Sequence, residues 1–199
     1  MSENSNAALS DEQLISRLAL GEVELLAELY VRHDAMVKAA LGRFASDISS
    51  DEREDLVQDV FLAVYDSAHR YPGEVAFRAW LYGIAVKKAR SWRRNTWVRL
   101  KLLRQNRGMG VGMAFRTNSS PARRVELREM IVRAVSSLQR DQREVMLLQA
   151  AEGFKGEEIA YILGINHETV RIRLHRARKK LRKSICSEHL LAALREDEP

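Results

Sequence analysis

The sequence has little that interrupts a helix. Its 199 residues include only three prolines and ten glycines, while Ala, Leu, Arg and Glu are abundant. This composition favours an all-α fold. Because no uninterrupted apolar stretch reaches about 18 residues, the length a spanning helix needs, we expect no membrane insertion.

Cysteine is nearly absent as well. Cys186 is the only one, which excludes a disulfide within the chain and makes a reducing compartment the natural one. The first residues, MSENSNAALSDEQ, are polar and acidic. A secretory signal begins basic and then turns apolar. We therefore expect a soluble, cytoplasmic protein.

Acidic residues are missing from one long segment. Residues 78–107 contain ten Arg and Lys and no Asp or Glu, whereas residues 1–59 hold thirteen acids against five bases. Residues 1–59 therefore carry a net charge of −8 and residues 60–199 a net charge of +14, which sum to +6. Such a division indicates two partners, one of them nucleic acid. Chance segregation of solvated surface charge is the alternative.

Apolar residues recur at helical spacing through most of the chain. The expected helices span residues 10–20, 22–44, 50–71, 76 into the basic segment, 141–152, 156–163 and 167–185. We expect two small helical domains joined by a flexible linker, with the domains at 1–106 and 122–185, the linker at 107–121 and a C-terminal tail at 186–199.

Local signals mark several helix ends. Ser10 is an expected N-cap of the first helix. Ser50 or Asp51 is expected to cap the third, with Glu54 as the acid of a capping box. The pair Pro72-Gly73 is a strong break before the fourth.

Residues 107–121, RGMGVGMAFRTNSSP, lack any apolar period. Their three alternating glycines superficially resemble a phosphate-binding turn. However, no strand precedes them, the spacing is not GxGxxG, and no GK[ST] follows. A flexible linker is therefore the favoured interpretation.

Residues 153–183 have the pattern of a helix-turn-helix. Gly164 supplies the left-handed turn after a short helix, and Asn166 is a good N-cap for the next one. The second helix has one apolar stripe that is expected to face inward. Its residues follow at spacings of four, three and four, namely Val170, Leu174, Ala177 and Leu181. Eight Arg or Lys in residues 167–183 face one acid, which suits the major groove and the phosphates of DNA.

Two other interpretations of this helix remain. A basic amphipathic helix can lie on a membrane or an acidic protein, although that role does not need the preceding turn and cap. His167 and His175 lie eight residues apart on one helix without partner ligands nearby, so we expect no metal site there.

Aromatic residues are interleaved with the cationic segment. They are Tyr71, Phe77, Trp80, Tyr82, Trp92 and Trp97. Phe77 and Trp80 share a face with Leu81 and Ile84, which is typical of core residues. Tyr71, Trp92 and Trp97 are less easily explained in this way. They suit stacking on single-stranded nucleic acid, whose phosphates the nearby cations neutralise.

Five segments resemble one family. DLVQDVFLAVY at 55–65 and FRAWLYGIA at 77–85 resemble region 2 of bacterial sigma factors of the extracytoplasmic-function (ECF) type, in the sigma-70 family. LQRDQREV at 138–145, EEIAYILG at 157–164 and TVRIRLHRAR at 169–178 are similar to its region 4. The resemblance covers roughly residues 15–95 and 122–185. A helix-turn-helix alone is weakly specific, whereas the two signatures together are strong.

The resemblance implies a subunit that binds core RNA polymerase, directs it to promoters and helps to open the duplex. By resemblance, the residues docking on the polymerase are Asp51, Asp55, Gln58, Asp59 and Leu62. Those capturing the melted −10 element are Tyr71, Phe77, Arg78, Trp80, Lys87, Lys88, Arg90, Trp92, Arg93 and Arg94. Those reading the −35 duplex are His167, Glu168, Thr169, Arg171, Ile172, Arg173, His175, Arg176 and Arg178. The family is usually held by an anti-sigma factor, which makes one an expected partner.

The chain departs from the family pattern in places. Many relatives carry an Arg-Asn pair and then an Asp where this chain has Val86, Lys87 and Ser91. Ile172 occupies a position often held by serine. We therefore expect the promoter preference of this chain to be individual, set at Ile172 and His175.

Two other functions account for part of the sequence. A transcriptional activator that binds duplex operators would explain residues 122–185 but not the region-2-like segments. An enzyme acting on nucleic acid would need clustered carboxylates, metal-ligand spacing or a nucleophile motif, and we find none of these in the sequence. We therefore expect no catalytic residue, no metal and no cofactor.

Overall fold

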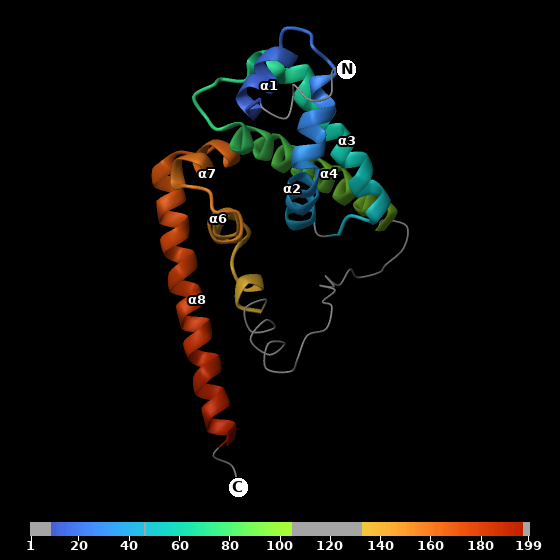
Figure 1. Cartoon of the computed structure of the whole chain (residues 1–199). Coiled ribbons are helices and arrows are strands. Elements are labelled where there is room, and N and C mark those ends of the chain that lie inside the picture. The colour runs from blue at the N-terminus through green and yellow to red at the C-terminus, as the bar shows by residue number, and fades with distance from the viewer. Residues whose placement is uncertain (1–8, 46, 105–132, 197–199) are drawn as a thin grey trace. The chain divides into compact units, whose positions relative to one another are not determined.

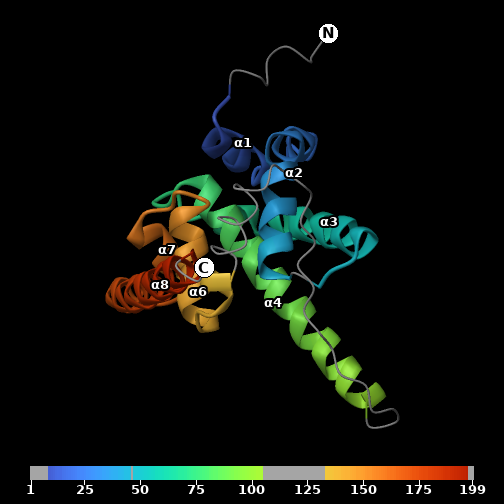
Figure 2. The ribbon, with the colours of Figure 1, turned by 90° about the horizontal axis from the view of Figure 1, so that it is seen from below.

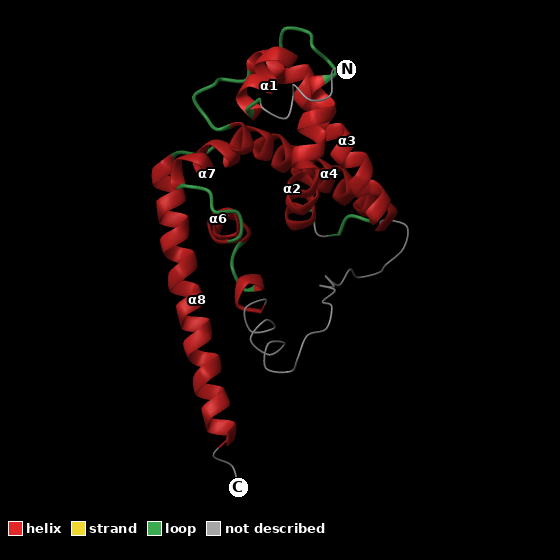
Figure 3. Cartoon of the chain, in the orientation of Figure 1, coloured by secondary structure: helices red, strands yellow, loops and turns green. Residues whose placement is uncertain are grey.

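The computed structural model describes residues 9–45, 47–104 and 133–196, and within these the side chains of 9–45, 47–97 and 133–184. Every regular element in these ranges is a helix (Figures 1 and 3), which confirms the all-α prediction. None of these helices is long and apolar enough to span a membrane. The helices fall into two compact units. The predicted linker, 107–121, and the domain boundaries on either side of it lie outside the described residues.

Between residues 9 and 104, the described residues of the first unit form five helical elements. They are α1 (Asp11–Leu18), α2 (Leu25–Phe44), α3 (Ser50–Ser67), the short 3-10 helix η2 (Ala68–Arg70) and α4 (Phe77–Arg104). Helices α2, α3 and α4 pack against one another, and α1 lies against α2 and η2 (Figure 2). Apolar side chains at helical spacing fill the space between them, among them the fully buried Leu29, Leu41, Val57, Val60 and Leu81.

Two capping boxes begin helices of this unit. Ser10 accepts a hydrogen bond from the backbone N–H of Gln13, whose side chain in turn accepts from the Ser10 N–H, as expected for an N-cap. At α3 the prediction of Ser50 or Asp51 was wrong, since Ser49 forms the box with Glu52. Three residues able to cap a helix follow one another here, so the local sequence does not choose among them.

Helix α4 is continuous over 28 residues. It begins after the Pro72-Gly73 break and includes residues 78–104 of the acid-free segment without interruption. In Figure 2 its C-terminal part extends past the other helices of this unit. The described part of the basic segment, residues 78–104, is therefore presented on a helix and not on a loop.

The second unit is built around the helix-turn-helix. It contains α6 (Arg140–Ala150), α8 (His167–Glu196) and the first turns of α7 (Gly156–Leu163). Helix α6 packs on α8. The apolar side chains buried in this unit include Val145, Leu148, Phe154, Ile159 and Val170. Helix α8 continues without a break past residue 185, so the predicted tail begins as part of the same helix.

The turn of the helix-turn-helix follows the predicted local chemistry. Gly164 has a φ of +65°, a left-handed conformation that glycine adopts without a Cβ clash. Asn166 Oδ1 accepts a hydrogen bond from the backbone N–H of Thr169 at 2.7 Å, which is an N-cap contact. At the start of α7, Glu158 accepts from the Lys155 N–H at 2.7 Å. The Gly164 turn and the Asn166 cap define where α8, the second helix of the motif and hereafter the recognition helix, begins.

Candidate nucleic-acid interface

The recognition helix has one buried and one exposed face. Val170, Leu174 and Ala177 of the predicted inward stripe are buried and Leu181 is half-buried. Of the predicted DNA-reading residues, Thr169 and Arg173 are half-buried. The exposed ones are His167, Glu168, Arg171, Ile172, His175, Arg176 and Arg178. The stripe therefore presents most of the predicted set to solvent on one surface.

Side chains of α6 hold two of these cations, Arg173 and Arg178, in place. The Arg173 Nε lies 3.3 Å from an oxygen of Asp141, and Arg178 donates to the side-chain oxygen of Gln149 at 2.7 Å. Both acceptors belong to α6, and Arg178 lies 29 residues after Gln149. Because part of the side-chain entropy of these arginines is already lost in the protein, less remains to be lost on DNA.

The imidazole of His167 packs on the backbone at the start of α7. A Cβ built on Gly156 would lie 2.4 Å from the His167 Nε2, closer than real Cβ contacts come. Any larger residue at position 156 would therefore require the imidazole to move. The sequence did not indicate this contact, since Gly156 carries no turn signal of its own.

Three aromatic rings of the predicted −10 site form a cluster in the first unit. The ring centroid of Tyr71 lies 6.1 Å from that of Phe77 and 5.4 Å from that of Trp80, both edge to face. Phe77 and Trp80 are buried. They act as core residues in this structure, as their periodicity predicts, and support the loop from inside.

Tyr71 closes the loop that precedes α4. Its hydroxyl donates a hydrogen bond to the backbone carbonyl of Val75 at 2.6 Å. Burial raises the pKa of Tyr71 above its ordinary value of 10.0 because the phenolate would lose solvation. The hydroxyl thus keeps its proton and its hydrogen bond throughout the neutral range.

The remaining residues of the predicted −10 site lie along α4. Arg78, Lys87, Arg93 and Arg94 are exposed, whereas Lys88, Arg90 and Trp92 are half-buried. Further along the helix, Trp97 is 62% exposed. This part of α4 therefore offers cations and aromatic rings together.

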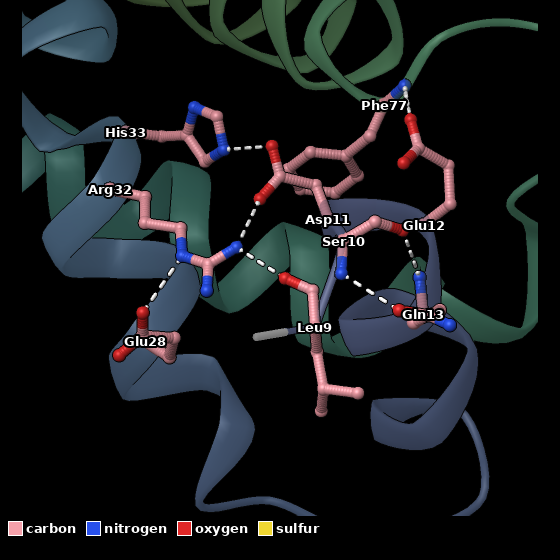
Figure 4. A network of polar contacts seen from close by, with 9 residues as sticks. All are labelled: Leu9, Ser10, Asp11, Glu12, Gln13, Glu28, Arg32, His33 and Phe77. Atoms are coloured by element: carbon pink, nitrogen blue, oxygen red, sulfur yellow. Dashed lines mark hydrogen bonds and ion pairs between the residues drawn. The ribbon is translucent and has the colours of Figure 1, made fainter. Parts of the chain in front are cut away.

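Helix α1 is held against α2 by an ionic network that the sequence did not indicate (Figure 4). Asp11 lies 3.1 Å from the Arg32 Nη1 and 2.7 Å from the His33 Nε2. Arg32 also donates to the Leu9 carbonyl and to Glu28, each at 2.8 Å. The carboxylates around Arg32 raise its pKa, the Glu28 hydrogen bond most.

The same helix reaches the start of α4. The Glu12 carboxylate accepts a hydrogen bond from the backbone N–H of Phe77 at 3.3 Å (Figure 4). The first N–H groups of a helix have no partner within the helix. Glu12 thus serves as an acceptor at the N-terminus of α4, directly after the loop that Tyr71 closes.

The predicted polymerase-binding residues share the outward face of α3. All are exposed, namely Asp51, Asp55, Gln58, Asp59 and Leu62. Leu62 is 57% exposed, and Tyr65 one turn later is 42% exposed. Asp59 also lies 3.9 Å from the Lys88 Nζ of α4. This face combines negative charge with apolar surface.

No metal site is evident among the residues that the structure describes. There, no group of three or more His, Cys, Asp or Glu side chains is placed to hold an ion.

Comparison with known proteins assigns both units. Residues 29–99 match sigma-70 region 2, and residues 128–181 match sigma-70 region 4. The ECF RNA polymerase sigma-E factor of Escherichia coli K12 is 29% identical over 189 residues, covering 87% of this chain and 93% of that protein. The sigma-E factor of Haemophilus influenzae is 29% identical over 184 residues, covering 89% and 96%.

Two solved structures are similar over most of the chain. CnrH, in complex with the cytosolic domain of CnrY, has a TM-score of 0.58 at 28% identity and covers 94% of this chain and 99% of its own. The sigma factor RpoE of Bartonella quintana, in complex with the anti-sigma factor NepR, has a TM-score of 0.57 at 28% identity, covering 78% and 96%. With region 2 and region 4 both present and in that order, the chain belongs to the sigma-70 family, as a sigma factor of the ECF type.

Proposed function

We propose that this chain binds core RNA polymerase through α3, reads the −35 element with α8, and captures the melted −10 element beside the start of α4. As an ECF sigma factor it is a non-catalytic subunit that directs RNA polymerase to promoters. The observation that carries the assignment of surfaces is the recognition helix, which exposes cationic residues on one face while Val170, Leu174 and Ala177 bury the other.

The −35 contact rests on the geometry of the second unit. The turn at Gly164 and the Asn166 cap define the start of α8, and the N-terminal turns of such a helix contact base edges in the major groove. Arg171 and Arg176 are exposed there and suit guanine, which arginine binds with two hydrogen bonds. The later cations, from Arg178 onward, suit phosphates.

The −10 contact rests on the loop 71–76 and on α4. Tyr71 lies at the loop, and exposed cations with Trp92 and Trp97 follow along the helix. Melting breaks stacking of about 1.4 kcal/mol per base-pair step. Stacking a captured base on an aromatic side chain returns about 1–3 kcal/mol. A few captured bases therefore suffice to bias opening without ATP.

The polymerase contact rests on the exposed face of α3. An acidic face that also exposes apolar side chains suits a basic, partly apolar partner surface. Leu62 supplies an apolar anchor. Asp59 lies one turn before it on the helix and Asp55 two turns before it. This division of labour explains why the acidic and the basic halves of the chain are separate.

An anti-sigma factor is the proposed regulatory partner. The RpoE protein of Bartonella quintana was solved with an anti-sigma factor, and RpoE and this chain are similar over most of their length. A partner that covers the exposed faces of α3 and α8 would block both the polymerase and the DNA contacts.

The activator alternative is not compatible with the comparisons. It accounts only for the second unit, whereas residues 29–99 match sigma-70 region 2. The two functions also differ in solution, because an activator binds duplex operators without polymerase. We expect the purified chain to bind promoter DNA weakly and to gain affinity for it when core polymerase is added.

The experiment that tests the assignment of surfaces uses one promoter with three forms. In the first the −35 region is scrambled, in the second the −10 region is scrambled, and in the third the −10 region is scrambled and already unpaired. We expect Arg176→Ala to lower initiation from the second and third forms, in which the −35 region is intact. Initiation from the first form, whose −35 region is scrambled, should not change. If Arg176→Ala weakens all three forms equally, Arg176 contacts the DNA backbone and not the −35 bases. If scrambling the −35 region leaves initiation by the unsubstituted chain unchanged, α8 does not read the −35 element.

A further inference from the structure

The recognition helix carries one large apolar side chain on its exposed face. Ile172 is 42% exposed, whereas Val170 and Leu174 on either side of it are buried. Residues 167–183 of the same helix contain eight Arg or Lys. Ile172 therefore does not belong to the inward stripe, and packing within the unit does not explain its side chain.

The neighbours of Ile172 place it at the centre of the DNA-facing surface. Residues three or four apart on a helix are adjacent, so Glu168 lies one turn before it and His175 and Arg176 one turn after it. All three are exposed. The Glu168 carboxylate is held by Arg171 at 2.9 Å, which leaves Ile172 between an ion pair and an imidazole.

The chemistry of isoleucine limits what it can recognise. Its side chain has no donor or acceptor, so it binds neither a phosphate nor a polar base edge. Of the groups that bases present in the major groove, the C5-methyl of thymine is the one that apolar side chains contact. A branched side chain covers such a methyl group and removes it from water.

We propose that Ile172 contacts the C5-methyl group of one thymine in the −35 element and makes that position thymine-specific. This inference rests on the proposed function, in which α8 reads the −35 duplex. It adds an apolar contact to the polar ones expected of Arg171 and Arg176. It also explains how Ile172 would give this chain a promoter preference of its own.

The test removes only the methyl group from the DNA. A randomised −35 library, transcribed by core polymerase with the full chain, first identifies the positions at which thymine is selected. Each selected thymine is then replaced by deoxyuridine, which pairs identically but lacks the C5-methyl. We expect one replacement to lower initiation about fourfold, which corresponds to the roughly 0.8 kcal/mol of one buried CH₂-sized group.

Substitutions of Ile172 then test the protein side of the same contact. Ile172→Val keeps a branched apolar side chain and is expected to keep the preference for thymine over deoxyuridine. Ile172→Ala is expected to abolish that preference at the same position. Val31→Ala is the matched control, because Val31 is an apolar side chain of α2 that is 77% exposed and lies outside the second unit.

The possible outcomes distinguish the Ile172–thymine contact from the reading of the −35 element by α8. If initiation depends on the −35 sequence but no deoxyuridine replacement matters, the thymine contact is wrong and the −35 reading stands. If initiation does not depend on the −35 sequence at all, the proposed function of α8 fails. If Ile172→Ala lowers initiation equally on thymine and deoxyuridine templates and weakens binding to core polymerase, Ile172 contacts protein and not DNA.

Discussion

The Glu12 carboxylate of α1 accepts a hydrogen bond from the backbone N–H of Phe77, the first residue of α4, across 65 residues of sequence. This contact ties the first described helix to the point where the proposed −10 loop enters α4. Asp11, the neighbouring residue, ties the same helix to Arg32 and His33 of α2. Helix α1 is therefore anchored on α2 and contacts the start of α4, directly after the loop.

Loss of this contact should loosen the loop. Glu12→Ala is expected to destabilise the first unit by about 1 kcal/mol, the usual size of an N-terminal cap, and to slow opening of duplex promoters. Thermal denaturation and permanganate footprinting measure the two effects. Glu24→Ala is the matched control, since Glu24 stands at the N-cap of α2 without a side-chain cap hydrogen bond. Equal effects of the two substitutions would refute a special role for Glu12.

The hydroxyl of Tyr71 should matter separately from its ring. Tyr71→Phe keeps the edge-to-face contacts with Phe77 and Trp80 but removes the hydrogen bond to the Val75 carbonyl. We expect a loss of about 1 kcal/mol in unfolding free energy. Because burial raises the pKa of Tyr71, the Tyr71 contribution is fully present below pH 10 and is lost as the pH rises through the folded pKa. A difference between native protein and variant that grows above pH 10 would contradict this sign.

Arg176 should contribute to sequence discrimination and not only to affinity. Arg176→Ala is expected to lower initiation from the preferred −35 sequence by about 1–3 kcal/mol, the value of one bidentate contact to guanine. Competition between preferred and altered −35 templates measures the change. Lys179→Ala is the comparison, as a phosphate contact weakens all sequences alike and reduces the salt dependence. A uniform loss in Arg176→Ala would reassign this residue to the backbone.

The Leu62 side chain should be needed for binding to core polymerase but not for folding. The side chain is 57% exposed, so Leu62→Ala is expected to leave the melting temperature unchanged. Its affinity for core polymerase should fall at least fivefold, which corresponds to about 1 kcal/mol for an interface anchor. Fluorescence anisotropy with labelled chain gives the affinity, and Val31→Ala is the control. An unchanged affinity would place the polymerase contact elsewhere.

Features encoded within one or two helical turns could be predicted from the sequence. The helix periodicity, the Ser10 cap, the left-handed Gly164 and the Asn166 cap all depend on nearby residues, and the structure confirms each of them. The cap of α3 was misplaced because Ser49, Ser50 and Asp51 have similar local chemistry.

Contacts between helices could not be predicted in this way. Glu12 and Phe77, or Asp141 and Arg173, meet only because the tertiary fold brings their helices together. No periodicity or motif marks such pairs. For Phe77 the periodicity indicated a core residue while the family resemblance indicated a DNA contact, and its burial agrees with the periodicity.

The most direct test of the function is transcription with purified components. Core RNA polymerase is incubated with promoter DNA in the presence and absence of this chain, and every RNA 5′ end is mapped. We expect the chain to create discrete start sites that share −35 and −10 sequences and that core polymerase alone does not use. An unchanged set of 5′ ends, with a chain that is folded and binds the polymerase, would contradict the assignment as an initiation factor.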